Sequence, residues 1–154
     1  MVAGNGGFVM DTLSLRAEHG VILRLVSQLG GRAHNVKSRE DADHARLLIG
    51  VIDLLLNDHL AHEDAELYPA LSHAPDPEIR ALGASASEEM GGLAGAWINY
   101  RDHWTQAAIL AHGRRFGAAT EGFIRALSLR IEMENDILYP AMDRLSGAQE
   151  RSAA

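Results

Sequence analysis

The chain has no cysteine among its 154 residues, and this absence narrows the chemistry that it can perform. No disulfide, thiolate metal site or cysteine nucleophile is possible, so histidine and carboxylate side chains are the metal ligands that remain. No run of about 18 apolar residues occurs, and residues 1–10 lack the basic start and apolar stretch of a secretion signal. We therefore expect a cytoplasmic protein that does not enter a membrane.

Positive charge is also scarce. The net charge is −7, and no block of lysine or arginine stands out. Nucleic acids and anionic membranes attract proteins mainly through clusters of basic residues. The sequence therefore gives no electrostatic reason to expect either as a partner, and it does not indicate a protein partner.

Proline is limited to four residues and aromatic residues to 5%, whereas leucine and alanine are abundant. This composition, without long β-branched alternation, favours helices. Apolar residues at helical spacing predict long helices over roughly residues 11–29, 41–68, 76–104 and 116–139. Glycines 30–31 and the prolines at 69 and 140 mark expected helix ends, and residues 105–115 read as a loop or an early helical turn. We expect an all-α, antiparallel up-and-down four-helix bundle over residues 11–145, with a flexible arm at 1–10 and a flexible tail at 146–154.

The second predicted helix carries ionisable side chains on the face that should be apolar. Its apolar stripe leads, without a break, into His59, Glu63 and Glu66. At about 100° per residue these three side chains share one face, so an imidazole and carboxylates point toward the core. Glu66 can be an added ligand, a partner for Arg130, or exposed at the bundle end, and the last reading is favoured.

The chain contains an internal repeat with an offset of 71 residues. The segment Glu63–Ala70 aligns with Glu134–Ala141, with Glu, Leu, Tyr, Pro and Ala identical. The same offset places His19 on Met90 and His59 on Arg130. Two related helical hairpins should thus face one central site. The inward positions of the first half are His19, His59, Glu63 and Glu66, and those of the second half are Met90, Arg130, Glu134 and Ile137.

Three motifs in this arrangement resemble the hemerythrin-like (HHE cation-binding) family: Glu18-His19, His59-x-x-x-Glu63 followed by Leu-Tyr-Pro, and Glu134 followed by Leu-Tyr-Pro. The resemblance covers roughly residues 11–145 and implies an up-and-down four-helix bundle around two non-haem irons, which two glutamates bridge. It implies that His19 and His59 would serve one metal and that Glu63 and Glu134 would be the bridging pair.

The second half-site departs from the family pattern. Met90 and Arg130 stand where the resemblance implies the second metal's histidines, and a guanidinium has no lone pair to donate. Charge counting points to one ion, because the three glutamates (63, 66 and 134) and Arg130 sum to −3 + 1 = −2. The resemblance therefore implies one intact site, which His19, His59, Glu63 and Glu134 form, for a single metal ion.

The favoured interpretation is a metal-binding protein that holds mononuclear non-haem iron, with zinc or manganese as alternatives. It would sense or bind dioxygen or nitric oxide, or respond to iron. The rival interpretation is a metal-free helical regulatory or interaction module in which Arg130 replaces the lost metal charge. An iron oxidase or peroxidase is a third, less favoured reading, because it needs two metals or an exposed redox site and Met90 and Arg130 count against this.

Overall fold

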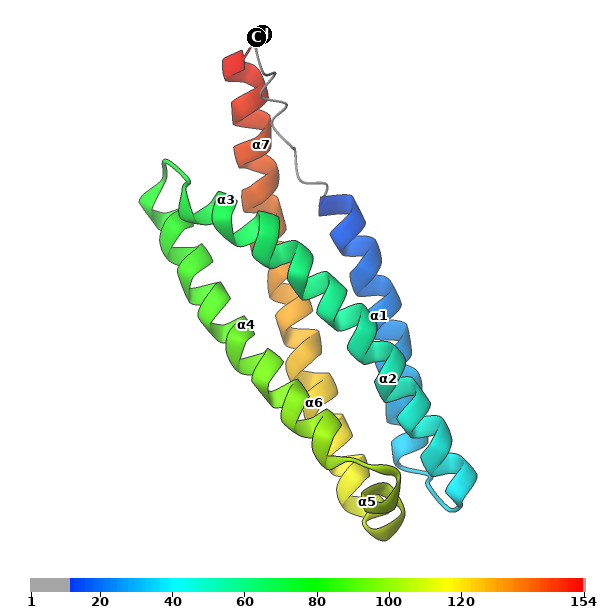
Figure 1. The fold of residues 1–154 in the computed structure, drawn as a ribbon. Coiled ribbons are helices and arrows are strands. Elements are labelled where there is room, and N and C mark those ends of the chain that lie inside the picture. Colours follow the sequence, from blue (N-terminus) through cyan, green and yellow to red (C-terminus); the bar gives the residue numbers. More distant parts are fainter. Residues whose placement is uncertain (1–11, 154) are drawn as a thin grey trace, which may run out of the picture.

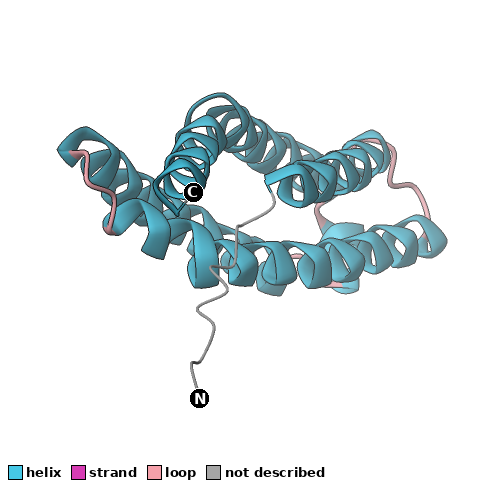
Figure 2. Cartoon of the chain, turned by 90° about the horizontal axis from the view of Figure 1, so that it is seen from above, coloured by secondary structure: helices cyan, strands magenta, loops and turns pink. Residues whose placement is uncertain are grey.

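The structure, a computed structural model, describes residues 12–153 as a bundle of helices that run up and down beside one another (Figure 1). The helices are α1 (Thr12–Ala33), α2 (Arg39–His62), α3 (Tyr68–Ser72), α4 (Pro77–His103), α5 (Gln106–Ala111), α6 (Gly113–Met133) and α7 (Tyr139–Ala153), and two π-helical turns are η1 (Glu63–Leu67) and η2 (Glu134–Leu138). Figure 2, which looks down the bundle, shows only helices and connecting loops among the described residues. The all-α antiparallel bundle is thus confirmed. The arm predicted at residues 1–10 lies outside the described residues.

Two of the long helices begin at capping residues. Asp76 accepts a hydrogen bond from the Glu78 amide at 2.8 Å, and Pro77 follows at the first position of α4, as the sequence predicted. Ser38 caps α2, accepting from the Asp41 amide at 3.1 Å. The Asp41 carboxylate in turn accepts from the Ser38 amide at 2.8 Å. This reciprocal pair starts α2 before the predicted residue 41.

The first helix does not end at its glycine pair. α1 continues through Gly30 and Gly31 to Ala33, and neither glycine has a positive φ. Gly30 instead permits a close approach to α6, because a Cβ built there would lie 2.9 Å from Cδ1 of Ile124. The helix end is stabilised by the side chain of Asn35, which donates to the Gly31 carbonyl at 2.9 Å.

The prolines at 69 and 140 do not end their helices either. Each lies at the second position of a new α-helical segment, α3 or α7, which directly follows a π-helical turn. Proline has no amide hydrogen and cannot extend the hydrogen-bond ladder of the preceding turn, but its fixed φ is compatible with a helix, so the helical path continues through it. η1 and η2 are 71 residues apart, like the sequence repeat, so the repeat extends to the backbone.

Two stretches that were not predicted as part of a long helix are helical in the structure. Residues 106–111 form the short helix α5, capped by Thr105, whose Oγ1 accepts from the Ala108 amide at 3.2 Å. At the other end, α7 runs through the predicted tail as far as Ala153 and extends beyond the other helices in Figure 1. None of the described helices is long and apolar enough to span a membrane.

Apolar side chains form two buried clusters, with a polar layer between them. The larger cluster includes the aromatic side chains of Trp97, Tyr100, Trp104, Phe116 and Phe123. The smaller cluster is built on the two Leu-Tyr-Pro segments and includes Met90, which is 6% exposed. Along α1, for example, Leu15 belongs to the smaller cluster and Ile22 to the larger, and His19 lies between them.

Candidate metal centre

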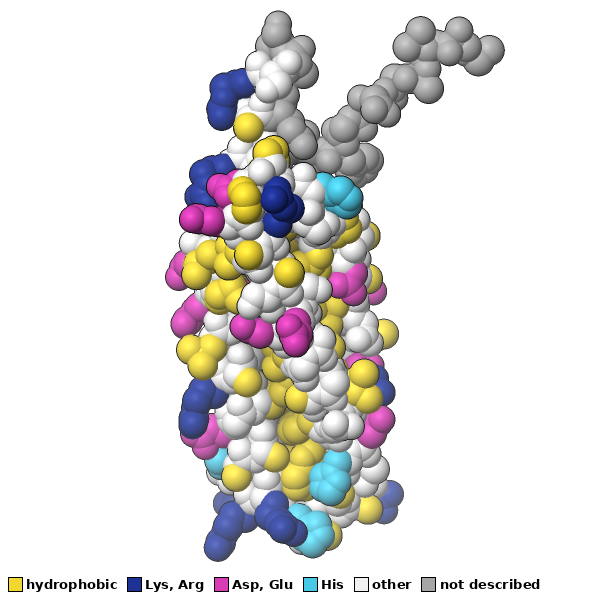
Figure 3. Space-filling model, turned by 90° about the vertical axis from the view of Figure 1, so that its left-hand side faces the viewer, with side chains coloured by type: hydrophobic (Ala, Val, Ile, Leu, Met, Phe, Trp, Pro, Cys, Tyr) yellow, Lys and Arg dark blue, Asp and Glu magenta, His cyan; other side chains and the backbone are white. Residues whose placement is uncertain are grey.

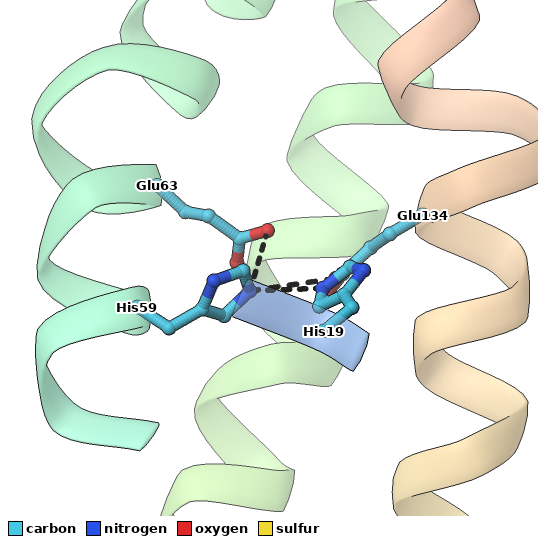
Figure 4. Close-up of side chains that lie close together, drawn as sticks. All are labelled: His19, His59, Glu63 and Glu134. Carbon is cyan, nitrogen blue, oxygen red and sulfur yellow. Dashed lines mark hydrogen bonds and ion pairs between the residues drawn. The ribbon is translucent and has the colours of Figure 1, made fainter. Parts of the chain in front are cut away.

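Four buried side chains from three helical segments converge in the polar layer. His19 projects from α1, His59 from α2, and Glu63 and Glu134 from the first residues of η1 and η2 (Figure 4). One ligand atom from each lies within 4.8 Å of the ligand atoms of the others. All four residues are at most 2% exposed. These are the four that the sequence singled out, and the structure brings all of them together.

The polar atoms of these four side chains are close enough to interact with one shared proton or cation. Nε2 of His19 lies 2.9 Å from Nε2 of His59 and 2.9 Å from Oε2 of Glu134. Nε2 of His59 lies 3.4 Å from Oε1 of Glu63. Two nitrogens and two carboxylates therefore point at one small volume.

Outer partners fix the orientation of both imidazole rings. Nδ1 of His59 donates to Oε2 of Glu18 at 2.7 Å, and Nδ1 of His19 donates to Oδ1 of Asn135 at 3.0 Å. When the protons are on these outward nitrogens, the inward Nε2 atoms of the neutral rings carry lone pairs. Two lone pairs at this separation repel each other unless a proton or a metal ion lies with them.

Tyr139 completes this half of the centre. Its hydroxyl donates to Oε1 of Glu63 at 2.8 Å and lies 3.1 Å from Nε2 of His19. Burial, together with the charges of Glu63 and Glu134, raises the pKa of Tyr139 well above its ordinary value. The phenol thus stays protonated and acts as a donor to the carboxylate.

Comparison with known proteins agrees with this geometry. A family model described as the hemerythrin HHE cation binding domain matches residues 12–142. The chain belongs to this family. No curated protein and no solved structure matches the chain.

In this hemerythrin-family chain the other half of the centre is occupied by Arg130. Its Nε donates to Oε1 of Glu134 at 2.8 Å, and its Nη2 donates to the hydroxyl of Tyr68 at 3.1 Å. Tyr68 corresponds to Tyr139 in the repeat, so each half has one tyrosine beside the centre. Met90, which takes the place of His19 in the repeat, is buried in the adjacent apolar cluster.

The electrostatics of the hemerythrin-like centre favour a cation. Burial alone would lower the pKa of His59, but the nearby carboxylates of Glu134, Glu63 and Glu18 outweigh it and raise that pKa to about 10. Burial alone would raise the pKa of Glu134, but the nearby imidazoles of His19 and His59, together with Arg130, lower it below its ordinary value. Glu134 thus stays ionised and attracts positive charge to the imidazoles.

The residues present fit a metal ion. Oε2 of Glu63 and Oε2 of Glu134 are buried without a hydrogen bond of acceptable geometry, although Nε2 of His19 lies 2.9 Å from the latter. Buried carboxylate oxygens without donors are costly, and a metal ion satisfies them. Two imidazoles and two carboxylates form a donor set that suits divalent iron, zinc or manganese.

Glu66, which the sequence placed on the same inward face, does not belong to the cluster. It is half-buried, and its repeat equivalent Ile137 is 46% exposed. The π-helical turns explain the difference, because one extra residue per turn rotates the following side chains by about 100° relative to a continued α-helix. Leu67 and Leu138 are fully buried after these turns.

Sequence reasoning also missed the roles of the outer partners. Glu18 was noted only as a neighbour of His19 in the chain, yet it binds His59 on another helix. Asn135 was not singled out. The repeated Leu-Tyr-Pro was the one available signal for the tyrosines, since a buried tyrosine hydroxyl needs a hydrogen-bond partner.

Proposed function

We propose that the protein holds one transition-metal ion, iron, through His19, His59, Glu63 and Glu134. The observation that carries this proposal is the convergence of two inward imidazole nitrogens on two buried carboxylates, each with an oxygen that lacks a hydrogen-bond donor. Family membership supports it, because the matching domain is a cation-binding one.

A single ion is proposed because Arg130 takes up the other half of the centre. Nε of Arg130 lies 2.8 Å from Oε1 of Glu134 and binds the oxygen that would otherwise be available to a second ion. The guanidinium itself has no lone pair to offer a metal. The charges also balance: Glu63 and Glu134 with Arg130 give −2 + 1 = −1, and Glu18, which binds His59, makes −2. One divalent ion neutralises this total.

Iron held by these residues would bind a small diatomic molecule, and we propose sensing or binding of dioxygen or nitric oxide as the role. The chain's own residues prepare the site for this. Glu18 and Asn135 hold the imidazoles in place, and Tyr139 holds Glu63. The apolar clusters on both sides keep bulk water from the polar layer.

The rival function is a metal-free regulatory module. The pair between Arg130 and Glu134 favours it, because a fixed guanidinium already neutralises one carboxylate. In that case the histidines would serve only to hydrogen-bond to the glutamates. Zinc and manganese are the other metals that the donor set accepts.

Metal stoichiometry tests the proposal. The protein is purified without chelator, supplied with ferrous ion under argon, desalted, and analysed for metal content. We expect one iron per chain in the wild type and in His44→Ala, a control with an exposed histidine on the same helix α2. His59→Ala should lose the metal. No metal in the wild type, or equal metal in His59→Ala, would refute the proposed centre and leave the metal-free module.

A further inference from the structure

A pocket of about 330 Å³ opens between α4 and α6, on the side of the centre where Arg130 lies. Its wall consists of Glu89, Leu93, Ala126, Leu129, Arg130 and Met133. Figure 3 views the molecule from the side on which α4 lies and shows groups of hydrophobic side chains with charged side chains among them and at the edges. Four of the six wall residues are apolar, so the pocket is mainly apolar, with one buried cation in its wall.

The guanidinium of Arg130 has one nitrogen to spare. Nε and Nη2 are bound to Glu134 and Tyr68, but Nη1 is buried and makes no hydrogen bond. Oε2 of Glu89 lies 3.6 Å from Nη1, and Glu89 also lines the pocket. This distance is too long for a hydrogen bond. The Glu89 side chain is 64% exposed while that of Arg130 is 6% exposed, so the ion pair is weak and Glu89 can turn into solvent.

A buried donor without a partner, next to an apolar pocket, defines the ligand that fits once Glu89 turns into solvent and gives access to Nη1. A buried N–H without an acceptor is costly, so a ligand that places an oxygen beside Nη1 would be stabilised by the hydrogen bond. Charge then selects among possible ligands. Arg130 is already opposed by Glu134 and Glu89, so an anion would add a third negative group around one guanidinium, and a cation would face the guanidinium itself.

Size sets the second requirement. A volume of about 330 Å³ corresponds to roughly eleven water molecules and lies at the lower end for small-molecule pockets. The wall beside Arg130 is built from leucine, methionine and alanine side chains, which favour an aliphatic body over a polar one.

We propose that this pocket binds a small uncharged molecule that carries one hydrogen-bond-accepting oxygen on a short aliphatic body. The oxygen accepts from Nη1 of Arg130. Nε of the same guanidinium donates to Glu134. A ligand that binds Nη1 therefore acts on a carboxylate of the metal centre through the Arg130 side chain alone. The pocket itself does not depend on a bound metal, so its test is independent of the proposed function.

The probe is 2-pentanone, titrated into the full chain with chelator present, and the readout is the chemical shift of the Leu93, Leu129 and Met133 methyl groups and of the Arg130 Nε–H group. We expect saturable shifts at all four. Butyrate, an anion of similar size, should give none at the same concentration. Saturable binding of butyrate as tight as that of the ketone would overturn the charge argument, and the absence of saturable shifts with the ketone would overturn the site.

A matched pair of variants tests the location. Ala126→Leu fills the pocket from α6, and Ala118→Leu makes the same change at an exposed position of α6 outside the pocket. We expect Ala126→Leu to weaken binding roughly tenfold, which corresponds to about 1.4 kcal/mol, and Ala118→Leu to leave it unchanged. Equal ketone affinity in the two variants would place the ligand elsewhere.

Discussion

Replacing Arg130 with methionine tests whether a fixed guanidinium stands in for a second metal. The change removes the partner of Oε1 of Glu134, at 2.8 Å, in a pair whose side chains are 6% and 1% exposed. Breaking one partner of a buried ion pair costs about 3–5 kcal/mol. Because His19 also faces Glu134, at 2.9 Å, the carboxylate retains one partner, and we expect the lower end, about 3 kcal/mol.

The same helix contains a matched control. Arg125 pairs with Glu121 at 3.1 Å with a spacing of four residues, like Arg130 and Glu134, but these side chains are 71% and 57% exposed. An exposed pair of this kind contributes about 0.3–0.5 kcal/mol. Arg125→Met therefore makes the same chemical substitution without the burial.

Urea unfolding with chelator present measures the difference. With an m value of about 2 kcal/mol/M, Arg130→Met should lower the unfolding midpoint by about 1.5 M and Arg125→Met by about 0.2 M. Added ferrous ion should stabilise Arg130→Met more than the wild type, because the variant no longer places a positive charge beside the ion. If the two variants unfold at the same midpoint, the buried pair does not carry the charge balance that we assign to it.

Three further predictions follow from the repeat, the helix contacts and the outer partners. The double variant Met90→His, Arg130→His restores the second half of the repeat, and elemental analysis should find two iron ions per chain; a content of one would contradict the equivalence. Gly83→Ala should lower the free energy of unfolding by about 1–3 kcal/mol, since the new Cβ would lie 2.7 Å from a leucine Cβ of α3. Gly92→Ala, with no atom within 4 Å of the new Cβ, should raise it by up to about 1 kcal/mol. Thermal unfolding of both variants measures these changes, and equal effects would contradict the close contact at Gly83. Glu18→Gln should weaken iron binding by about 10–100-fold in a competition titration with a chelator, and an unchanged affinity would show that the carboxylate does not tune its histidine partner.

The four clustered residues could be predicted because each lies on an apolar stripe. A stripe identifies the buried face of a helix, and the repeat identifies which buried faces meet. His59 and Glu63 interrupt the stripe of α2, and the offset of 71 residues led directly to Glu134. Neither step requires knowledge of how the helices cross.

The helix ends and the half-buried position of Glu66, which the sequence favoured as exposed, could not be predicted in the same way. An α-helical period was assumed through Pro69, but one turn in each half has π-helical hydrogen bonds, with the Tyr68 amide bonded to the Glu63 carbonyl. The change from α-helical to π-helical hydrogen bonds does not alter the spacing of the apolar residues that precede the turn, so the sequence pattern does not reveal it. Gly30 was misleading for a related reason, since it allows a helix contact and not a helix end.

The outer partners required the three-dimensional structure because they act across helices. Glu18 and His59 are 41 residues apart, and Asn135 and His19 are 116 apart. No local pattern connects such positions. Arg130, which one reading of the sequence paired with Glu66, pairs with Glu134 in the structure.

The paired π-helical turns also bear on the origin of the chain. η1 and η2 occupy equivalent positions, each starting at a glutamate of the centre and each followed by Tyr-Pro. If the two hairpins arose by gene duplication, a single ancestral insertion accounts for both turns, whereas the exchange of His for Arg at one position must have come afterwards. Before the duplication, two copies of one hairpin would have assembled as a symmetric homodimer with two equal half-sites. The present asymmetry would then be a later specialisation, which fusion into one chain allowed because the halves could mutate independently.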